Sequence, residues 1–97
     1  MAAVDYGMSV YVDDARFPYG RMVMCHMLAD STAELEEIAE KIGLPRKWIQ
    51  HAGTYREHYD ISLSKRRLAV FHGAKEITVR EAAELRKAKE IAEKSRG

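Results

Sequence analysis

The chain has 97 residues, of which 46% are hydrophobic and 32% charged, and its net charge is +1. This composition is that of one soluble globular domain and argues against a disordered chain. The small net charge argues against a protein that coats nucleic acid. The longest apolar run, residues 22–29, is too short to span a bilayer. A single cysteine, Cys25, cannot form an internal disulfide and indicates a reducing compartment, here the cytoplasm.

The first part of the chain contains one predicted strand. Residues 1–7 show no periodic pattern, so we expect a disordered leader there and a single α/β domain over residues 8–97. Residues 9–13 are rich in β-branched and aromatic side chains, and the acids Asp13 and Asp14 stand at their end. This composition predicts a buried strand that ends in carboxylates.

Residues 15–21 form a predicted loop, because Pro18 and Gly20 favour turns. In this segment two arginines, Arg16 and Arg21, are interleaved with two aromatic residues. Aromatic rings and guanidinium groups together can stack a base and neutralise a phosphate. The aromatic rings can equally cover the edge of the core. We favour that interpretation for the rings and keep the arginines as ligand-binding candidates.

Residues 22–29 are apolar at both alternating positions, which is typical of a strand buried on both faces of a parallel sheet. His26 interrupts this run, and Asp30 follows it. A buried imidazole must find hydrogen-bond partners or it destabilises the fold. A structural histidine bonded to a backbone carbonyl and a functional histidine are about equally consistent with this position.

Two predicted helices begin with capping signals. Ser31 and Glu34 have the spacing of a capping box, and the apolar stripe that follows ends at Gly43. The same capping-box spacing recurs at Thr78 and Glu81. We therefore predict one helix between Ser31 and Gly43 and a final helix that begins after Thr78.

A further helix is predicted over residues 62–72. At about 100° per residue, its larger apolar side chains share one buried arc. They are Leu63, Leu68, Val70 and Phe71. Arg67 falls inside that arc, whereas Arg66 falls outside it. An inward-facing arginine needs a carboxylate or a bound anion, unless its guanidinium reaches the rim of the core.

The predicted elements combine into a small α/β fold. A third strand is expected at residues 74–77, and a helical turn with a polar loop occupies residues 46–57. This order predicts a three-stranded, mainly parallel sheet with three helices packed on it. Because the carboxyl ends of parallel strands meet at one edge, we expect the site there. The sequence lacks the glycine-rich loops and cysteine pairs of common nucleotide and zinc sites.

Acidic and imidazole side chains supply the candidate site. The candidate catalytic residues are His26, His58 and Asp60. Carboxylates at strand ends can bind Mg²⁺ or Mn²⁺, which prefer oxygen ligands. The candidate metal ligands are Asp13, Asp14 and Asp30. The full set expected to bind a ligand is Asp13, Arg16, Arg21, His26, Asp30, His58, Asp60 and Arg67.

Several segments together resemble a known domain. In order along the chain they are Val10-Tyr11-Val12-Asp13, His26-Met27-Leu28-Ala29-Asp30, the capped helix with Glu34-Leu35, His58-Tyr59-Asp60 and Gly73-Ala74. This ordered set, over roughly residues 9–85, resembles a domain of unknown function in short bacterial and phage proteins. Similar domains can precede an HD-type phosphohydrolase domain.

The resemblance implies that the family's recurring polar positions are Asp13, His26, Asp30, His58 and Asp60. It brings no established activity with it. Cys25 stands where the family often has serine or tryptophan, so the resemblance implies no role for the thiol.

Three functions are consistent with these residues. The first is a binding module for a small phosphate-bearing molecule, with a nucleotide as the expected ligand and helix N-termini to receive the anion. The second is a metal-dependent hydrolase of phosphodiesters or nucleotides. The third is a structural or protein-binding domain whose histidines and aspartates form an internal hydrogen-bond network. We favour the first, which leaves enzymatic activity undecided. A homodimer is also consistent with the small sheet.

Overall fold

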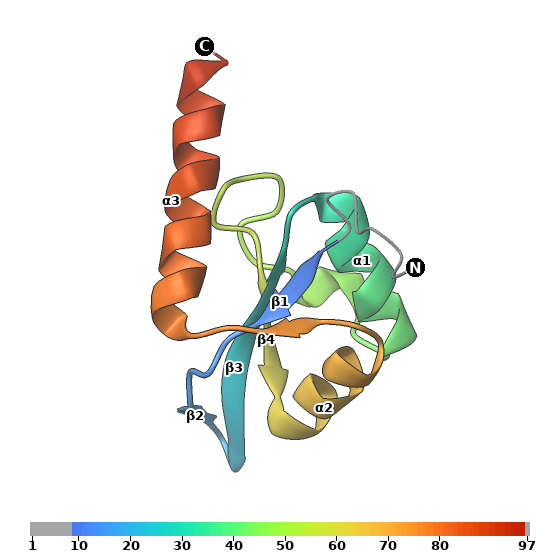
Figure 1. Ribbon diagram of the computed structural model, residues 1–97. Coiled ribbons are helices and arrows are strands. Elements are labelled where there is room, and N and C mark those ends of the chain that lie inside the picture. The colour runs from blue at the N-terminus through green and yellow to red at the C-terminus, as the bar shows by residue number, and fades with distance from the viewer. Residues whose placement is uncertain (1–8, 97) are drawn as a thin grey trace, which may run out of the picture.

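The computed structural model describes residues 9–96 and shows an α/β fold (Figure 1). The leader expected at residues 1–7 lies outside the described residues. Within them, five strands form one mixed sheet and three α-helices pack on it, so the α/β class and the three helices are confirmed. No helix in this part of the chain is long and apolar enough to cross a lipid bilayer.

The sheet is built around β3 (Met22–Ala29), which pairs with three antiparallel neighbours. On one side lie β1 (Val10–Val12) and β2 (Phe17–Tyr19), and on the other lies β4 (Tyr59–Ser62). The short strand β5 (Lys75–Glu76) is parallel to β1. The expectation of a three-stranded, mainly parallel sheet is therefore wrong.

Two strands were not predicted: β2 falls in the predicted loop at residues 15–21, and β4 overlaps the start of the predicted helix at residues 62–72. β2 contains Pro18, which lacks an amide hydrogen and is tolerated because β2 lies at an end of the sheet. Gly20, with a φ of 59°, makes the tight turn from β2 into β3. β4 is only 4 residues long, and its alternating burial is too short a pattern to separate from the helix that follows. Pairing between distant segments, which local sequence does not encode, makes both segments strands.

Side chains alternate along β3, so the sheet has two different faces. Cys25 and Met27 point towards α1 (Thr32–Lys41) and α2 (Leu63–Phe71), and we call this the helix face. The core on the helix face also includes Leu35, Ile38, Tyr59, Ile61 and Ala69. β3 is thus apolar on both faces because it is central, and not because the sheet is parallel.

The opposite face, which we call the site face, carries Met24, His26 and Asp60. α3 (Val79–Ser95) runs along this side of the sheet, away from α1 and α2 (Figure 1). It is fastened by Lys89, whose ammonium group donates to the carbonyl of the last residue of β3. The start of β3, which pairs with β2, extends beyond α3 and is exposed (Figure 1).

The capping signals are confirmed. The hydroxyl of Ser31 accepts a hydrogen bond from the Glu34 amide at 3.2 Å. Thr78 and Glu81 form a complete capping box, with side-chain to backbone distances of 3.0 and 2.9 Å. The turn expected near residue 46 is a 3₁₀ helix, η1 (Arg46–Trp48). These elements are predictable because each signal lies within a few residues of the structure that it specifies.

The buried arc predicted for α2 is right for Val70, which packs against the core, but wrong for other members. Leu68 and Phe71 are 43% and 82% exposed, and Arg67 also points to solvent. Besides Val70, the inward positions are Arg66 and Ala69, which is fully buried. α2 packs on the sheet through its small alanine, which allows a close approach. The prediction gave weight to the large apolar side chains and so chose the wrong rotation of the helix.

Candidate functional site

Strand register places His26 between two acids. Asp13 continues beyond β1, and its amide donates to the His26 carbonyl at 3.0 Å. On the other side of β3, His26 pairs with Asp60 of β4. His58 lies two residues before Asp60, so alternation turns its side chain to the same face. Asp13, His26, His58 and Asp60 therefore meet on the site face of the sheet, and not at the carboxyl edge that a parallel sheet would have offered.

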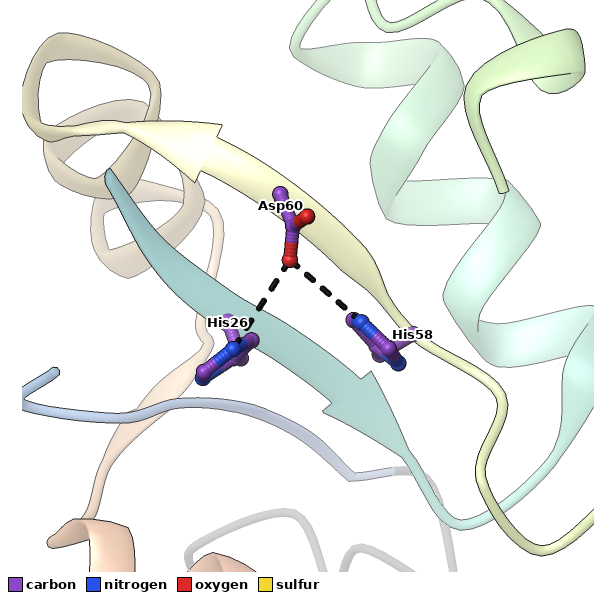
Figure 2. Close-up of side chains that lie close together, drawn as sticks. All are labelled: His26, His58 and Asp60. Atoms are coloured by element: carbon purple, nitrogen blue, oxygen red, sulfur yellow. Dashed lines mark ion pairs between the residues drawn. The ribbon is translucent and has the colours of Figure 1, made fainter. Parts of the chain in front are cut away.

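Figure 2 shows His26, His58 and Asp60 pointing towards one another. Asp60 Oδ1 lies 3.3 Å from His58 Nε2 and 3.8 Å from His26 Nε2. The three side chains are between 18% and 30% exposed, so the cluster lies near the protein surface. The two imidazole rings meet edge to face, with centroids 5.3 Å apart.

Asp13 holds the His26 ring from the other side. Its side chain is 1% exposed, Oδ2 lies 2.7 Å from His26 Nδ1, and Oδ1 accepts from the His26 amide at 2.9 Å. A carboxylate only accepts, so His26 Nδ1 carries the hydrogen and Nε2 is left towards Asp60. Burial opposes ionisation of Asp13, but hydrogen bonds from His26 outweigh it and lower the Asp13 pKa. The same bond outweighs burial and raises the pKa of His26.

Like His26, His58 and Asp60 are each held by a hydrogen bond to the atom that points away from the cluster, Nδ1 of His58 and Oδ2 of Asp60. His58 Nδ1 lies 2.7 Å from the Arg56 carbonyl oxygen, which only accepts, so Nδ1 is the donor. Asp60 Oδ2 accepts from the Gln50 amide nitrogen at 2.5 Å. Asp60 Oδ1 is buried and receives no hydrogen bond within the described chain, although both imidazoles lie within ion-pairing distance. Each side chain thus has one atom fixed and one atom turned inward.

The three inward-facing atoms could hold a metal ion. His26 Nε2, His58 Nε2 and Asp60 Oδ1 all lie within 4.8 Å of one another. With both imidazoles neutral, each atom presents an electron pair, an unfavourable arrangement without a proton or cation between them. Two imidazoles and a carboxylate, each fixed through its outer atom, are a common construction for metal ligands. Imidazole suits Zn²⁺, Fe²⁺ and Ni²⁺ better than the expected Mg²⁺, which prefers oxygen ligands.

The carboxylates predicted to bind metal do not form a cluster within residues 9–96. Both oxygens of Asp13 are used to hold His26. Asp14 accepts from the Val79 amide at 2.8 Å, at the start of α3. Asp30 accepts from the Tyr11 hydroxyl at 3.1 Å. The candidate metal ligands Asp13, Asp14 and Asp30 therefore do not come together in one site, because each carboxylate is engaged with a different partner.

The predicted arginines are spread over the surface. Arg16 donates to the neighbouring Ala15 carbonyl at 2.7 Å and is exposed, as are Arg21 and Arg67. Arg66, the residue predicted to point outward, instead donates to the Asp13 carbonyl at 3.1 Å. The arginine whose charge acts on the site is one that the sequence did not single out, Arg86 of α3, which works against the raised pKa of His26.

Sequence reasoning also missed three groups that shape the site. They are the Gln50 side chain, the Arg56 carbonyl and the Phe17 ring, which stacks on His26 with centroids 5.0 Å apart. Gln50 reaches the site because its backbone pairs with that of His58 at 2.9 and 3.1 Å. No local sequence signal indicates the pairing of Gln50 with His58. For Phe17, the interleaved aromatic and basic residues around it were a partial signal of a role in the site.

Cys25 is separated from the site by the sheet itself. Adjacent strand residues point to opposite faces, so the thiol lies in the core on the helix face and is fully buried. Burial raises the pKa of the thiol to about 11. A thiol that stays protonated and out of reach of solvent is a poor nucleophile, so Cys25 belongs to the core and not to the chemistry.

A cavity of about 430 Å³ opens beside Asp60. Its lining comes from three separate segments and includes Tyr19, Met22, Trp48 and Gln50. Asp60 contributes both to this cavity and to the three inward-facing atoms. A molecule in the cavity would therefore contact Asp60, the residue that also supplies one of those three atoms.

The comparisons with known proteins agree with the resemblance noted in the sequence. Residues 10–89 match the profile of a family described as a protein of unknown function, DUF4031. No curated protein and no solved structure matches the chain significantly. The matched region contains His26, His58 and Asp60 together with Asp13, which holds His26. The chain belongs to the DUF4031 family.

Proposed function

We propose that this protein is a hydrolase of phosphate esters that depends on one divalent metal ion bound by His26, His58 and Asp60. The observation that carries the proposal is Asp60 Oδ1, a buried carboxylate oxygen without a hydrogen bond. It faces two imidazole nitrogens that are kept free of hydrogen in the neutral rings, because the Nδ1 atoms donate to Asp13 and to a backbone carbonyl.

An internal hydrogen-bond network explains the arrangement less well. Such a network stabilises a fold when its polar groups are buried and paired within the protein. Here the histidines and Asp60 are partly exposed, Asp60 Oδ1 receives no hydrogen bond within residues 9–96, and a cavity lies alongside. These features support a site that receives something from solvent.

The ligand set favours a hydrolytic role. Three protein ligands leave positions for water and substrate, and a bound metal ion lowers the pKa of its water to about 7, which supplies a nucleophile. The protein then needs no nucleophilic side chain of its own, in line with the burial of Cys25 on the far face. The task of Asp13 is to keep the hydrogen of His26 on Nδ1, so that Nε2 can ligate.

Positive charge near the site favours a phosphate ester as the substrate. Arg86 lies close enough for its charge to act on His26. Guanidinium groups bind phosphate through paired hydrogen bonds. Two imidazoles and a carboxylate also serve iron oxygenases, and the charge of Arg86 is the feature that favours phosphate chemistry. In this proposal, the phosphate-bearing molecule that the sequence led us to expect as a ligand is the substrate that is hydrolysed.

Metal analysis and phosphatase assays test the proposal together. Protein loaded with Zn²⁺, Fe²⁺, Mn²⁺ or Ni²⁺ and then dialysed should retain one ion per chain with at least one of these metals. The loaded protein should hydrolyse para-nitrophenyl phosphate or its bis ester. His58→Ala and Asp60→Asn should lose both properties. Asp30→Asn is the matched control, because Asp30 is a nearby carboxylate bonded to Tyr11 outside the cluster.

The proposal fails if no metal is retained, or if the loaded protein has no activity above that of the His58→Ala variant. Retained metal that is insensitive to His58→Ala and Asp60→Asn would place the ion elsewhere and would also contradict it.

A further inference from the structure

We infer that the cavity beside Asp60 binds the base of a nucleoside phosphate, with Trp48 and Tyr19 as its aromatic walls. The inference rests on the proposed function, because it assigns the phosphate of the same molecule to the metal ion. The volume of about 430 Å³ falls within the range of about 300–1,000 Å³ that is usual for small-molecule sites.

The cavity collects large apolar side chains that the fold leaves exposed. Tyr19 is 66% exposed, Trp48 54% and Met22 47%. They come from both strands of the β2–β3 hairpin and from η1, yet all three line the same cavity. Core packing does not account for their position, because each presents much of its surface to solvent. Contiguous exposed apolar surface of this kind is characteristic of binding sites.

Strand alternation puts Tyr19, Met22 and the proposed metal ligands on one face. Tyr19 is paired with Met22, and Met24 with Ser62. His26 lies two and four residues after the methionines, so all three share the site face. Asp60 then joins the two regions, since it lines the cavity and supplies the inward-facing oxygen. A molecule with a flat apolar group and a phosphate can therefore occupy both regions at once.

The chemistry of the walls selects a base over a purely hydrocarbon ring. Aromatic faces and thioether groups attract flat, polarisable rings. Gln50 adds an amide at the wall. Its nitrogen gives one hydrogen to Asp60, so its second hydrogen and its carbonyl oxygen can bond the edge of a base. Aromatic stacking combined with an amide at the ring edge is how proteins read a base that is not paired.

The single tryptophan makes base binding directly measurable. Trp48 is the only tryptophan in the chain, so its fluorescence reports on this cavity. Adenosine monophosphate and uridine monophosphate should each change that fluorescence saturably in metal-loaded protein. Ribose 5-phosphate and inorganic phosphate, which lack a base, should not change it. Equal responses to ribose 5-phosphate and to the nucleotides would overturn the inference.

Variants separate the role of the cavity from that of the metal. By calorimetry, Trp48→Ala and Tyr19→Ala should each weaken adenosine monophosphate binding by about 5- to 150-fold, the loss expected for one stacking ring. Phe71→Ala is the matched control, because Phe71 is an aromatic residue 82% exposed on α2 and outside the cavity lining. Circular dichroism checks that each variant is folded. Unchanged affinity in both folded cavity variants would contradict the inference.

Hydrolysis gives a second comparison. Trp48→Ala should lower kcat/KM about tenfold or more for a nucleotide and leave it unchanged for glycerol phosphate, which has no ring to stack. Hydrolysis of both esters at equal rates, insensitive to Trp48→Ala, would remove the base site and leave the proposed metal hydrolase intact. Saturable nucleotide binding without any metal-dependent hydrolysis would support the base site and contradict the proposed metal hydrolase.

Discussion

The two faces of the sheet use the same strand in opposite ways. On the helix face, β3 contributes Cys25 and Met27, which are both fully buried in an apolar core. On the site face, one residue away, His26 is 30% exposed and is held between two acids. Each face has a buried polar atom of β4 without a hydrogen bond, Tyr59 Oη on the helix face and Asp60 Oδ1 on the site face, but Asp60 Oδ1 lies within ion-pairing distance of two imidazoles. Strand alternation thus separates the apolar core from the polar cluster.

Substitution of two methionines of β3 tests the difference in packing between the two faces. Met27 is fully buried on the helix face, and Met22 is 47% exposed at the start of the same strand. Met27→Ala should lower the free energy of unfolding by about 2–5 kcal/mol, because it leaves a cavity in the core. Met22→Ala should change it by less than about 0.5 kcal/mol, as is usual for surface substitutions. Denaturant titrations followed by circular dichroism give both values. Similar losses in both variants would mean that the two faces are equally packed.

The Asp13→Asn variant tests whether Asp13, the residue that follows β1, orients His26 for metal binding. In Asp13→Asn, one of the two positions that bond His26 becomes an NH₂ group, which cannot accept from the imidazole or its amide. His26 then loses a bond or moves its hydrogen to Nε2, the proposed metal-binding atom. We expect metal affinity to fall about 10- to 100-fold, as for other residues that orient metal ligands. Titration with Zn²⁺ against a chelating indicator measures it. Unchanged affinity would show that Asp13 does not orient His26.

The smallest expected effect is a pH dependence of the metal-free protein. The hydrogen bond to Asp13 raises the folded pKa of His26 above 6.5, so its stabilising contribution is complete below pH 6.5 and is lost as the pH rises through the folded value. Hydrogen bonds from His26, which outweigh burial, lower the Asp13 pKa below 3.8. The Asp13 contribution is therefore present above pH 3.8 and is lost as the pH falls through its folded value.

Melting temperature in the presence of a chelator should therefore be highest between these two limits and should fall on the alkaline side. His26→Gln should flatten the alkaline fall, while Met22→Ala should leave it as in the unchanged protein. The effect should be modest, because His26 is partly exposed and solvent screens its charge. An alkaline fall of the same size in His26→Gln would assign it to other groups.

The elements that were predictable from sequence are those specified locally. The Ser31 and Thr78 caps begin helices, and the structure places helices at both. β2 and β4 were not predictable, because 3- and 4-residue segments become strands only through pairing with β3. The prediction that the strands are mainly parallel was wrong for the same reason. An apolar run such as β3 marks a central strand, but it does not say whether its neighbours are parallel.

The candidate site divides along a similar line. His26, His58 and Asp60 could be named from the sequence as titratable groups in or beside apolar runs. Their roles depend on which atom of each side chain faces inward, and that is set by partners such as the Arg56 carbonyl and the Gln50 amide. Sequence cannot place those partners. Asp13 was accordingly taken for a metal ligand, although its oxygens hold His26 from the outer side.

The most direct test of the account is the position of a bound ion. Crystals of the protein grown with Zn²⁺ should show one strong anomalous peak at the zinc absorption edge, bounded by His26 Nε2, His58 Nε2 and Asp60 Oδ1. That result would establish the metal centre on the site face. A peak among Asp13, Asp14 and Asp30, or no peak between the two imidazoles, would contradict it.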